Sequence, residues 1–151
     1  MKIIDSIKGI LIEQIKSYRL LLEVLQKERE CLINLDADEV ERLSKEKDTL
    51  LLKLRFLEEE RIRLIKRFTS DNRISIGTTL QGLADFTADD DFKIMRSQLK
   101  SLLQSIQELN DFNMILIDRS LKVARHSISF LESFGLFINQ NNTGVMLSKE
   151  I

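Results

Sequence analysis

The sequence contains no proline and no tryptophan, and only five of its 151 residues are glycine. Proline and glycine are the residues that most often interrupt helices and form tight turns between strands. Charged residues make up 31% of the chain and hydrophobic residues 43%. This composition is typical of long helices and coiled coils, and it argues against a fold built from β-sheets.

Residues that carry chemistry are also scarce. The chain has one histidine, His126, and one cysteine, Cys31, almost a hundred residues apart, and no glycine-rich phosphate loop. The sequence therefore predicts no catalytic site, no metal site and no cofactor. A single cysteine cannot form an internal disulfide, so we expect a reduced, cytoplasmic protein.

Neither sign of charge dominates, and long apolar runs are missing. Lysine and arginine total 23 against 24 aspartates and glutamates, which leaves a formal net charge of -1 and disfavours binding to nucleic acid. No uncharged apolar run approaches the roughly 18 residues of a membrane span, and charges are scattered from Lys2 onward, so we expect no membrane insertion and no signal peptide.

Two segments near the start repeat apolar residues at every seventh position. The first row is Ile4, Leu11, Tyr18, Leu25 and Leu32, and the second is Leu43, Leu50, Leu57 and Leu64. This repeat predicts helices over residues 1–34 and 36–70, each with one buried face. Asp36 and Glu39 have the spacing of a capping box at the start of the second helix.

The repeat is interrupted over residues 71–91 and resumes in a third segment. The interruption predicts a connection that holds a short helix capped by Thr78 or Thr79. The acidic triplet at 89–91 suits the start of the next helix, where carboxylates cap free amides. A third helix is expected over residues 92–135. Its apolar row is Met95, Leu102, Leu109, Leu116, Val123, Phe130 and Phe137.

These segments predict an all-α fold, in which one domain over residues 1–151 forms an elongated antiparallel bundle or coiled coil of three long helices. At about 1.5 Å per residue, the third helix spans about 65 Å and the first two only about 45 to 50 Å. The third helix must therefore extend beyond the others or bend.

Charge almost disappears near the end of the sequence, where Glu132 is the one formally charged residue between His126 and Ser148. Ten large apolar side chains remain there, more than one core stripe requires, and residues 136–151 are expected to form a flexible tail. Contiguous apolar surface usually marks a partner site. The candidates are Ile128, Phe130, Leu131, Phe134, Phe137 and Ile138, and the last five have the spacing of a helix-in-groove contact. Folding back onto the bundle, or a seam between two copies, would also bury them.

Two asparagines are further candidates for partner contact. Asn110 and Asn113 lie three residues apart and are expected to share one face of the third helix, with Ser120 and Ser127 extending the row. Polar residues in a seam either fix the register of the helices or contact a ligand, and both interpretations remain open.

Two stretches resemble the FlgN family. LLEVLQKERECLINLDADEVERLSKEKDTLLLKLRFLEEERIRLI, from Leu21 to Ile65, is similar to the first two helices of that family, with Glu46-Lys47 and a later Glu-x-x-Arg at Glu58. LNDFNMILIDRSL, from Leu109 to Leu121, resembles the family's Leu-Asn-x-x-Asn element. Family members often end in a segment with Tyr-Gly, whereas the one tyrosine here is Tyr18.

The resemblance implies a non-enzymatic cytoplasmic chaperone. It would bind the C-terminal helical regions of the hook-filament junction proteins FlgK and FlgL and deliver them to the flagellar type III export apparatus. Two alternatives stay open. One is a structural coiled-coil adaptor or homodimer, and the other is a FliT-like chaperone of the filament cap protein. A chaperone is expected to be a monomer or to self-associate weakly, whereas the structural alternative predicts a tight dimer.

Overall fold

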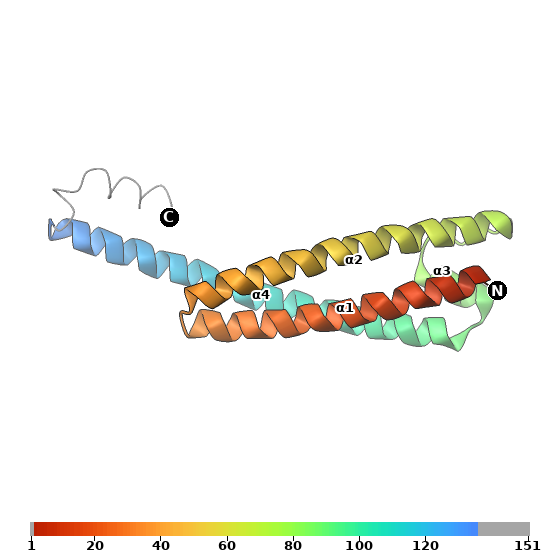
Figure 1. The fold of residues 1–151 in the computed structure, drawn as a ribbon, viewed down its shortest axis with the longest axis horizontal. Helices are drawn as coiled ribbons and strands as arrows, with labels where there is room; N and C mark the ends of the chain where they lie inside the picture. The colour runs from red at the N-terminus through yellow and green to blue at the C-terminus, as the bar shows by residue number, and fades with distance from the viewer. Residues whose placement is uncertain (1, 136–151) are drawn as a thin grey trace. The chain divides into compact units, whose positions relative to one another are not determined.

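The computed structural model describes residues 2–135, which form four helices and contain no strand (Figure 1). The helices are α1 (Lys2–Ile33), α2 (Ala37–Asp71), α3 (Leu80–Thr87) and α4 (Asp90–Ser133). The all-α prediction is therefore confirmed. The expected tail at 136–151 lies outside the described residues.

The chain divides into two compact units, one up to Asp111 and the other from Phe112 onward. The first unit holds α1, α2, α3 and the first half of α4, and the second holds the rest of α4. Helix α4 has 44 residues, whereas α1 has 32 and α2 has 35. The length difference expected from the sequence is thus present.

Helices α1 and α2 form an antiparallel pair joined by a short turn (Figure 1). Leu35 in this turn adopts a φ of 55°, and the Asp36 carboxylate accepts a hydrogen bond from the Glu39 amide at 3.2 Å. The predicted cap at Asp36 is confirmed. The Glu39 carboxylate pairs with Arg42, so the Asp36 to Glu39 bond is the half of the capping box that the structure shows.

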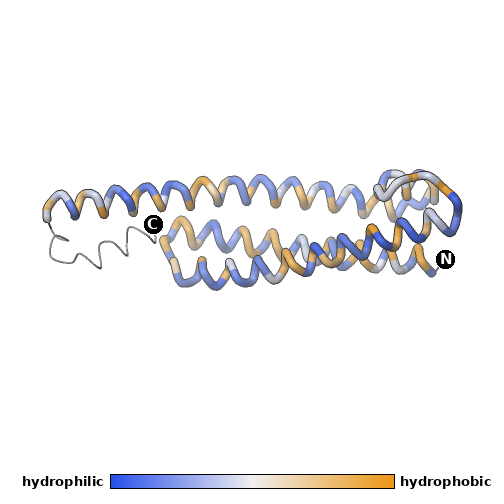
Figure 2. Tube along the Cα trace, turned by 90° about the horizontal axis from the view of Figure 1, so that it is seen from above, coloured by the Kyte–Doolittle hydropathy of each residue, from blue (hydrophilic) through white to orange (hydrophobic). Residues whose placement is uncertain are grey.

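The main core of the first unit lies where α3 meets the long helices. It combines residues of all four helices, because apolar and polar positions alternate along each of them so that one face can be buried (Figure 2). The buried members are Ile7, Leu11, Ile15, Leu64, Ile65, Phe68, Leu80, Leu83, Ala84, Phe92, Met95 and Leu99. Thr79 caps α3 by accepting a hydrogen bond from the Gly82 amide at 3.1 Å, as predicted.

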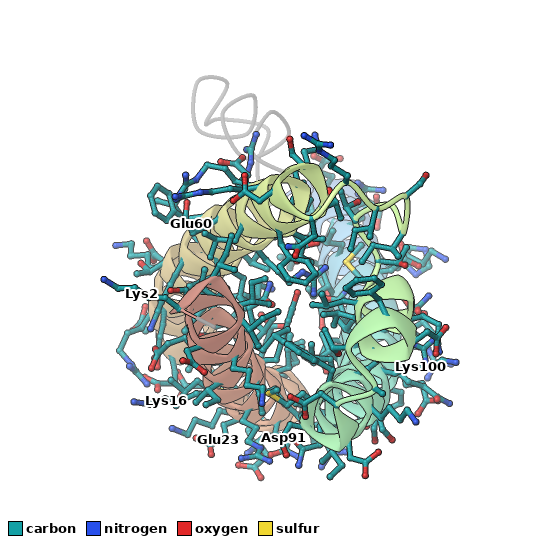
Figure 3. All side chains as sticks on the ribbon, turned by 90° about the vertical axis from the view of Figure 1, so that its right-hand side faces the viewer. Lys2, Lys16, Glu23, Glu60, Asp91 and Lys100 are labelled. Carbon is teal, nitrogen blue, oxygen red and sulfur yellow. The ribbon has the colours of Figure 1, made fainter. Side chains whose placement is uncertain are left out.

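A second, smaller core lies further along α1 and α2, around Leu21, Leu25 and Leu54. Gln14 is a polar side chain buried among the helices: its amide donates to the partly exposed Glu58 carboxylate at 2.8 Å, and Arg61 pairs with the same carboxylate. The charged side chains labelled on the outside of α1 and α2 point away from the interior (Figure 3). These labelled residues are Lys2, Lys16, Glu23 and Glu60.

The start of α4 is tied to α1 by charge. Lys8 contacts the Asp89 carboxylate at 2.7 Å and the Asp91 carboxylate at 3.0 Å, and its ammonium lies 5.4 Å from the centre of the Phe92 ring. Asp89 also accepts a hydrogen bond from the Asp91 amide at 2.9 Å. The acidic triplet therefore acts as a helix start, as the sequence predicted, and Asp90 rather than Phe92 is the first helical residue.

Candidate partner-binding surface

The second half of α4 is strongly amphipathic. With about 3.6 residues per turn, its charged side chains gather on one side of the helix and most of its large apolar side chains on the other, while Ile115 is an exposed apolar residue on the charged side. The charged side comprises Asp111, Asp118, Arg119, Lys122, Arg125 and Glu132. Lys122 and Asp118 form an exposed ion pair at 3.2 Å on that side. The opposite side is available for packing against another helix.

Six residues on the apolar side follow the alternating three and four spacing of a helix–helix seam. They are Met114, Ile117, Leu121, Ala124, Ile128 and Leu131, which we call the 3-4 seam. Met114 and Leu121 are exposed, and the other four are half-buried. Side chains at this spacing form a continuous apolar stripe that fits the apolar face of a second helix.

A second stripe, rich in aromatic residues, runs along the same helix and is separated from the 3-4 seam by a row of polar residues. We call it the aromatic stripe, and it consists of Phe112, Val123, Phe130 and Phe134. Val123, Phe130 and Phe134 are 65%, 62% and 66% exposed, and the rings of the two phenylalanines lie 4.7 Å apart. Large aromatic side chains at such exposure are typical of residues that anchor a partner.

Polar residues lie between the two stripes. Asn113 is 1% exposed, Ser120 is half-buried and Ser127 is exposed. Asn110, which we expected on the same face as Asn113, is exposed. The two asparagines thus have different surroundings, and Asn113 is the one that occupies a buried position.

The structure places four of the six predicted apolar candidates in these two stripes. Phe130 and Phe134 belong to the aromatic stripe, whereas Ile128 and Leu131 belong to the 3-4 seam. Phe137 and Ile138 lie outside the described residues. Phe112, Met114, Ile117 and Leu121 were not among the predicted candidates. The three and four spacing back from Leu131 reaches Leu121, Ile117 and Met114, whereas Phe112 does not belong to that row.

Elsewhere in the described residues, the side chains that could support catalysis or metal binding are few. Burial raises the pKa of the Cys31 thiol, and the carboxylates of Asp36 and Glu39 raise it further, so the thiolate that would act as a nucleophile is disfavoured. Residues 2–135 contain no group of three or more acidic, histidine or cysteine side chains placed to hold a metal ion. No helix within that range has the length and apolar character of a membrane span.

Comparison with known proteins assigns this chain to one protein family. No curated protein and no solved structure matches the chain. The sequence pattern of the FlgN protein family matches residues 1–134, which takes in almost everything the structure describes, including both stripes of α4. The chain therefore belongs to the FlgN family, a family of flagellar export chaperones.

Proposed function

We propose that this chain holds the C-terminal helical regions of hook-filament junction proteins of the FlgK and FlgL type in the cytoplasm and delivers them to the flagellar type III export apparatus. The single observation that carries the proposal is the exposure of the aromatic stripe on α4, especially Phe130 and Phe134. An isolated helix with a broad apolar side gains free energy when another helix covers that side.

The chemistry of the client also favours this role. A subunit that assembles outside the cell carries amphipathic terminal helices, which would self-associate if they were left uncovered. A helix of the chaperone that offers the 3-4 seam and the aromatic stripe would cover the apolar face of one client helix. Ser120, which is half-buried between the stripes, would set the register of the two helices, because a polar residue in a seam fits only one alignment.

The contact must be reversible, since an export chaperone releases its client. An interface built on a few exposed apolar anchors is smaller than the obligate interface of a permanent complex. Ordering the side chains of both partners on binding also lowers the net affinity. A moderate affinity is therefore expected of this surface.

Co-purification with FlgK and FlgL tests the proposal. The Phe130→Ala/Phe134→Ala double variant should lower the affinity for the client by at least about tenfold, because truncation of buried aromatic anchors is costly. Phe56→Ala is the matched control: Phe56 on α2 is 70% exposed, so it is equally accessible but lies outside the surface. Full client binding by the double variant, or an equal loss in Phe56→Ala, would contradict the proposal.

The same experiment separates the alternatives. Preferential capture of the filament cap protein would indicate a FliT-like chaperone. Sedimentation that shows a tight dimer, abolished by Phe130→Ala/Phe134→Ala, would instead identify the surface as a seam between two copies and favour the structural coiled-coil reading.

A further inference from the structure

The first unit contains an open cavity of about 560 Å³ that the proposed client surface does not use. Its walls come from α1, α2, the start of α3 with the two threonines before it, and α4. The cavity volume falls in the range of about 300 to 1,000 Å³ that is common for ligand sites. The site is thus large enough to receive several side chains of a partner.

Positive charge is in excess around this cavity. Arg61, Arg96 and Lys100 line it together with one carboxylate, that of Glu58. Arg61 is already paired with Glu58, whose other oxygen accepts from Gln14. Within residues 2–135, Arg96 and Lys100 form no ion pair. Two cations on the α4 wall are therefore available to a negatively charged group.

The same wall is also apolar. Arg96, Leu99, Lys100 and Leu103 have the spacing of one helix face, so the two cations alternate with two leucines. Tyr18 lines the cavity from α1, and burial, with the Glu58 charge, raises the pKa of its hydroxyl. The hydroxyl therefore stays protonated and can donate a hydrogen bond.

We propose that this cavity binds an amphipathic helix of a partner protein through acidic side chains on that helix, whose carboxylates pair with Arg96 and Lys100 while its apolar residues contact Leu103, which is exposed. A peptide fits better than a small free anion, because Leu103 offers an exposed apolar contact beside the cations. The proposal does not rest on the proposed function: it concerns other residues, in the other compact unit.

Two synthetic helical peptides of about 18 residues provide the test. They share the same leucine positions and differ only in carrying glutamate or glutamine beside them. Fluorescence anisotropy with the full chain at low salt should show that the glutamate peptide binds about tenfold more tightly, since each partly exposed ion pair adds up to about 1 kcal/mol. The Arg96→Gln/Lys100→Gln double variant should bind both peptides equally.

A matched control removes two other cations. Lys16 and Arg19 are exposed on α1, do not line the cavity, and form no ion pair within residues 2–135. Lys16→Gln/Arg19→Gln should preserve the tenfold preference, and so should Phe130→Ala/Phe134→Ala, which separates this site from the client surface. The proposal fails if neither peptide binds, if the preference survives in Arg96→Gln/Lys100→Gln, or if either control removes it.

Discussion

The two halves of α4 use similar apolar sequence in different ways. In the first half, Phe92 is completely buried, and Met95 and Leu99 are buried beside it in the main core. In the second half, Val123 and Phe130 continue the seven-residue row of Met95 but are mostly exposed. The difference shows that a repeat specifies which face of a helix is apolar, whereas the neighbours of that face decide whether it is core or surface.

The difference arises because the two halves of α4 have different neighbouring helices within the described residues. The first half of α4 meets side chains from α1, α2 and α3 in the cores of the first unit. The second half belongs to a unit in which α4 is the one helix within the described residues. Covering the exposed side chains of its apolar side with a partner helix would therefore release free energy.

Truncation of one phenylalanine in each half should show the largest contrast. Phe92→Ala is expected to lower the free energy of unfolding by about 3 to 5 kcal/mol, because it leaves a cavity in a fully buried site. Phe130→Ala should change it by less than about 0.5 kcal/mol, as is usual at exposed positions. Urea denaturation measures both, and a comparable loss in Phe130→Ala would contradict the contrast.

An ion pair in each region gives the next largest contrast. Lys47 pairs at 2.9 Å with Glu28, whose side chain is 3% exposed. Lys47→Met keeps the apolar stem but removes the charge beside this buried carboxylate, so a loss of about 2 to 3 kcal/mol is expected. Lys122→Met, which breaks the exposed pair with Asp118, should cost less than about 0.5 kcal/mol. Equal effects in thermal unfolding would show that Glu28 does not depend on Lys47.

Alanine substitutions at two glycines, one in α3 and one in α1, should change the free energy of unfolding in opposite directions. A Cβ on Gly82 would lie 2.5 Å from the backbone oxygen of Ile76, so Gly82→Ala should cost about 1 to 2 kcal/mol. Gly9 lies at an exposed position of α1, away from the helix ends. A Cβ there meets nothing within 4 Å, so Gly9→Ala should add about 0.5 to 1 kcal/mol of stability. Neither change should alter client binding, since both glycines belong to the first unit and neither is part of the two stripes. A stabilising Gly82→Ala would refute the close approach to Ile76.

The smallest expected effect depends on pH and concerns the start of α4. The Lys8 ammonium, and then the Asp91 amide, lower the pKa of Asp89 below its ordinary value of 3.8. A carboxylate with a lowered pKa stabilises the fold above the ordinary pKa, and this contribution is lost as the pH falls through the lowered value. The melting temperature of Asp89→Asn should therefore be lower than that of the wild type at neutral pH. In strong acid the two melting temperatures should be equal. A difference in melting temperature that does not change with pH would exclude this role.

Much of the fold could be predicted from the sequence because local signals determine it. The absence of proline and the seven-residue rows indicated helices, and the caps at Asp36 and Thr79 follow from side chains that accept hydrogen bonds from amides three residues ahead. The polar cluster of buried Gln14 with the partly buried Glu58 and Arg61 was not predicted, because a search for apolar rows cannot find polar residues whose partners lie on another helix.

The candidate surface could be predicted in part. Its aromatic residues were visible as apolar side chains in a stretch with little charge, and the structure finds Phe130 and Phe134 exposed. The different surroundings of Asn110 and Asn113 could not be predicted, since burial depends on tertiary neighbours. Their role in partner binding, like that of the other candidates, stays a prediction.

The most direct test of an uncovered apolar side on α4 is fluorine NMR of the chain labelled with fluorophenylalanine, in the presence of a soluble paramagnetic agent. In the isolated monomer, the signals of Phe130 and Phe134 should broaden strongly while that of Phe92 does not. Addition of a FlgK or FlgL C-terminal region should then protect Phe130 and Phe134. Two results would contradict an uncovered apolar side. One is that Phe130 and Phe134 are as protected as Phe92 in the monomer, and the other is that they stay unprotected when the client is bound.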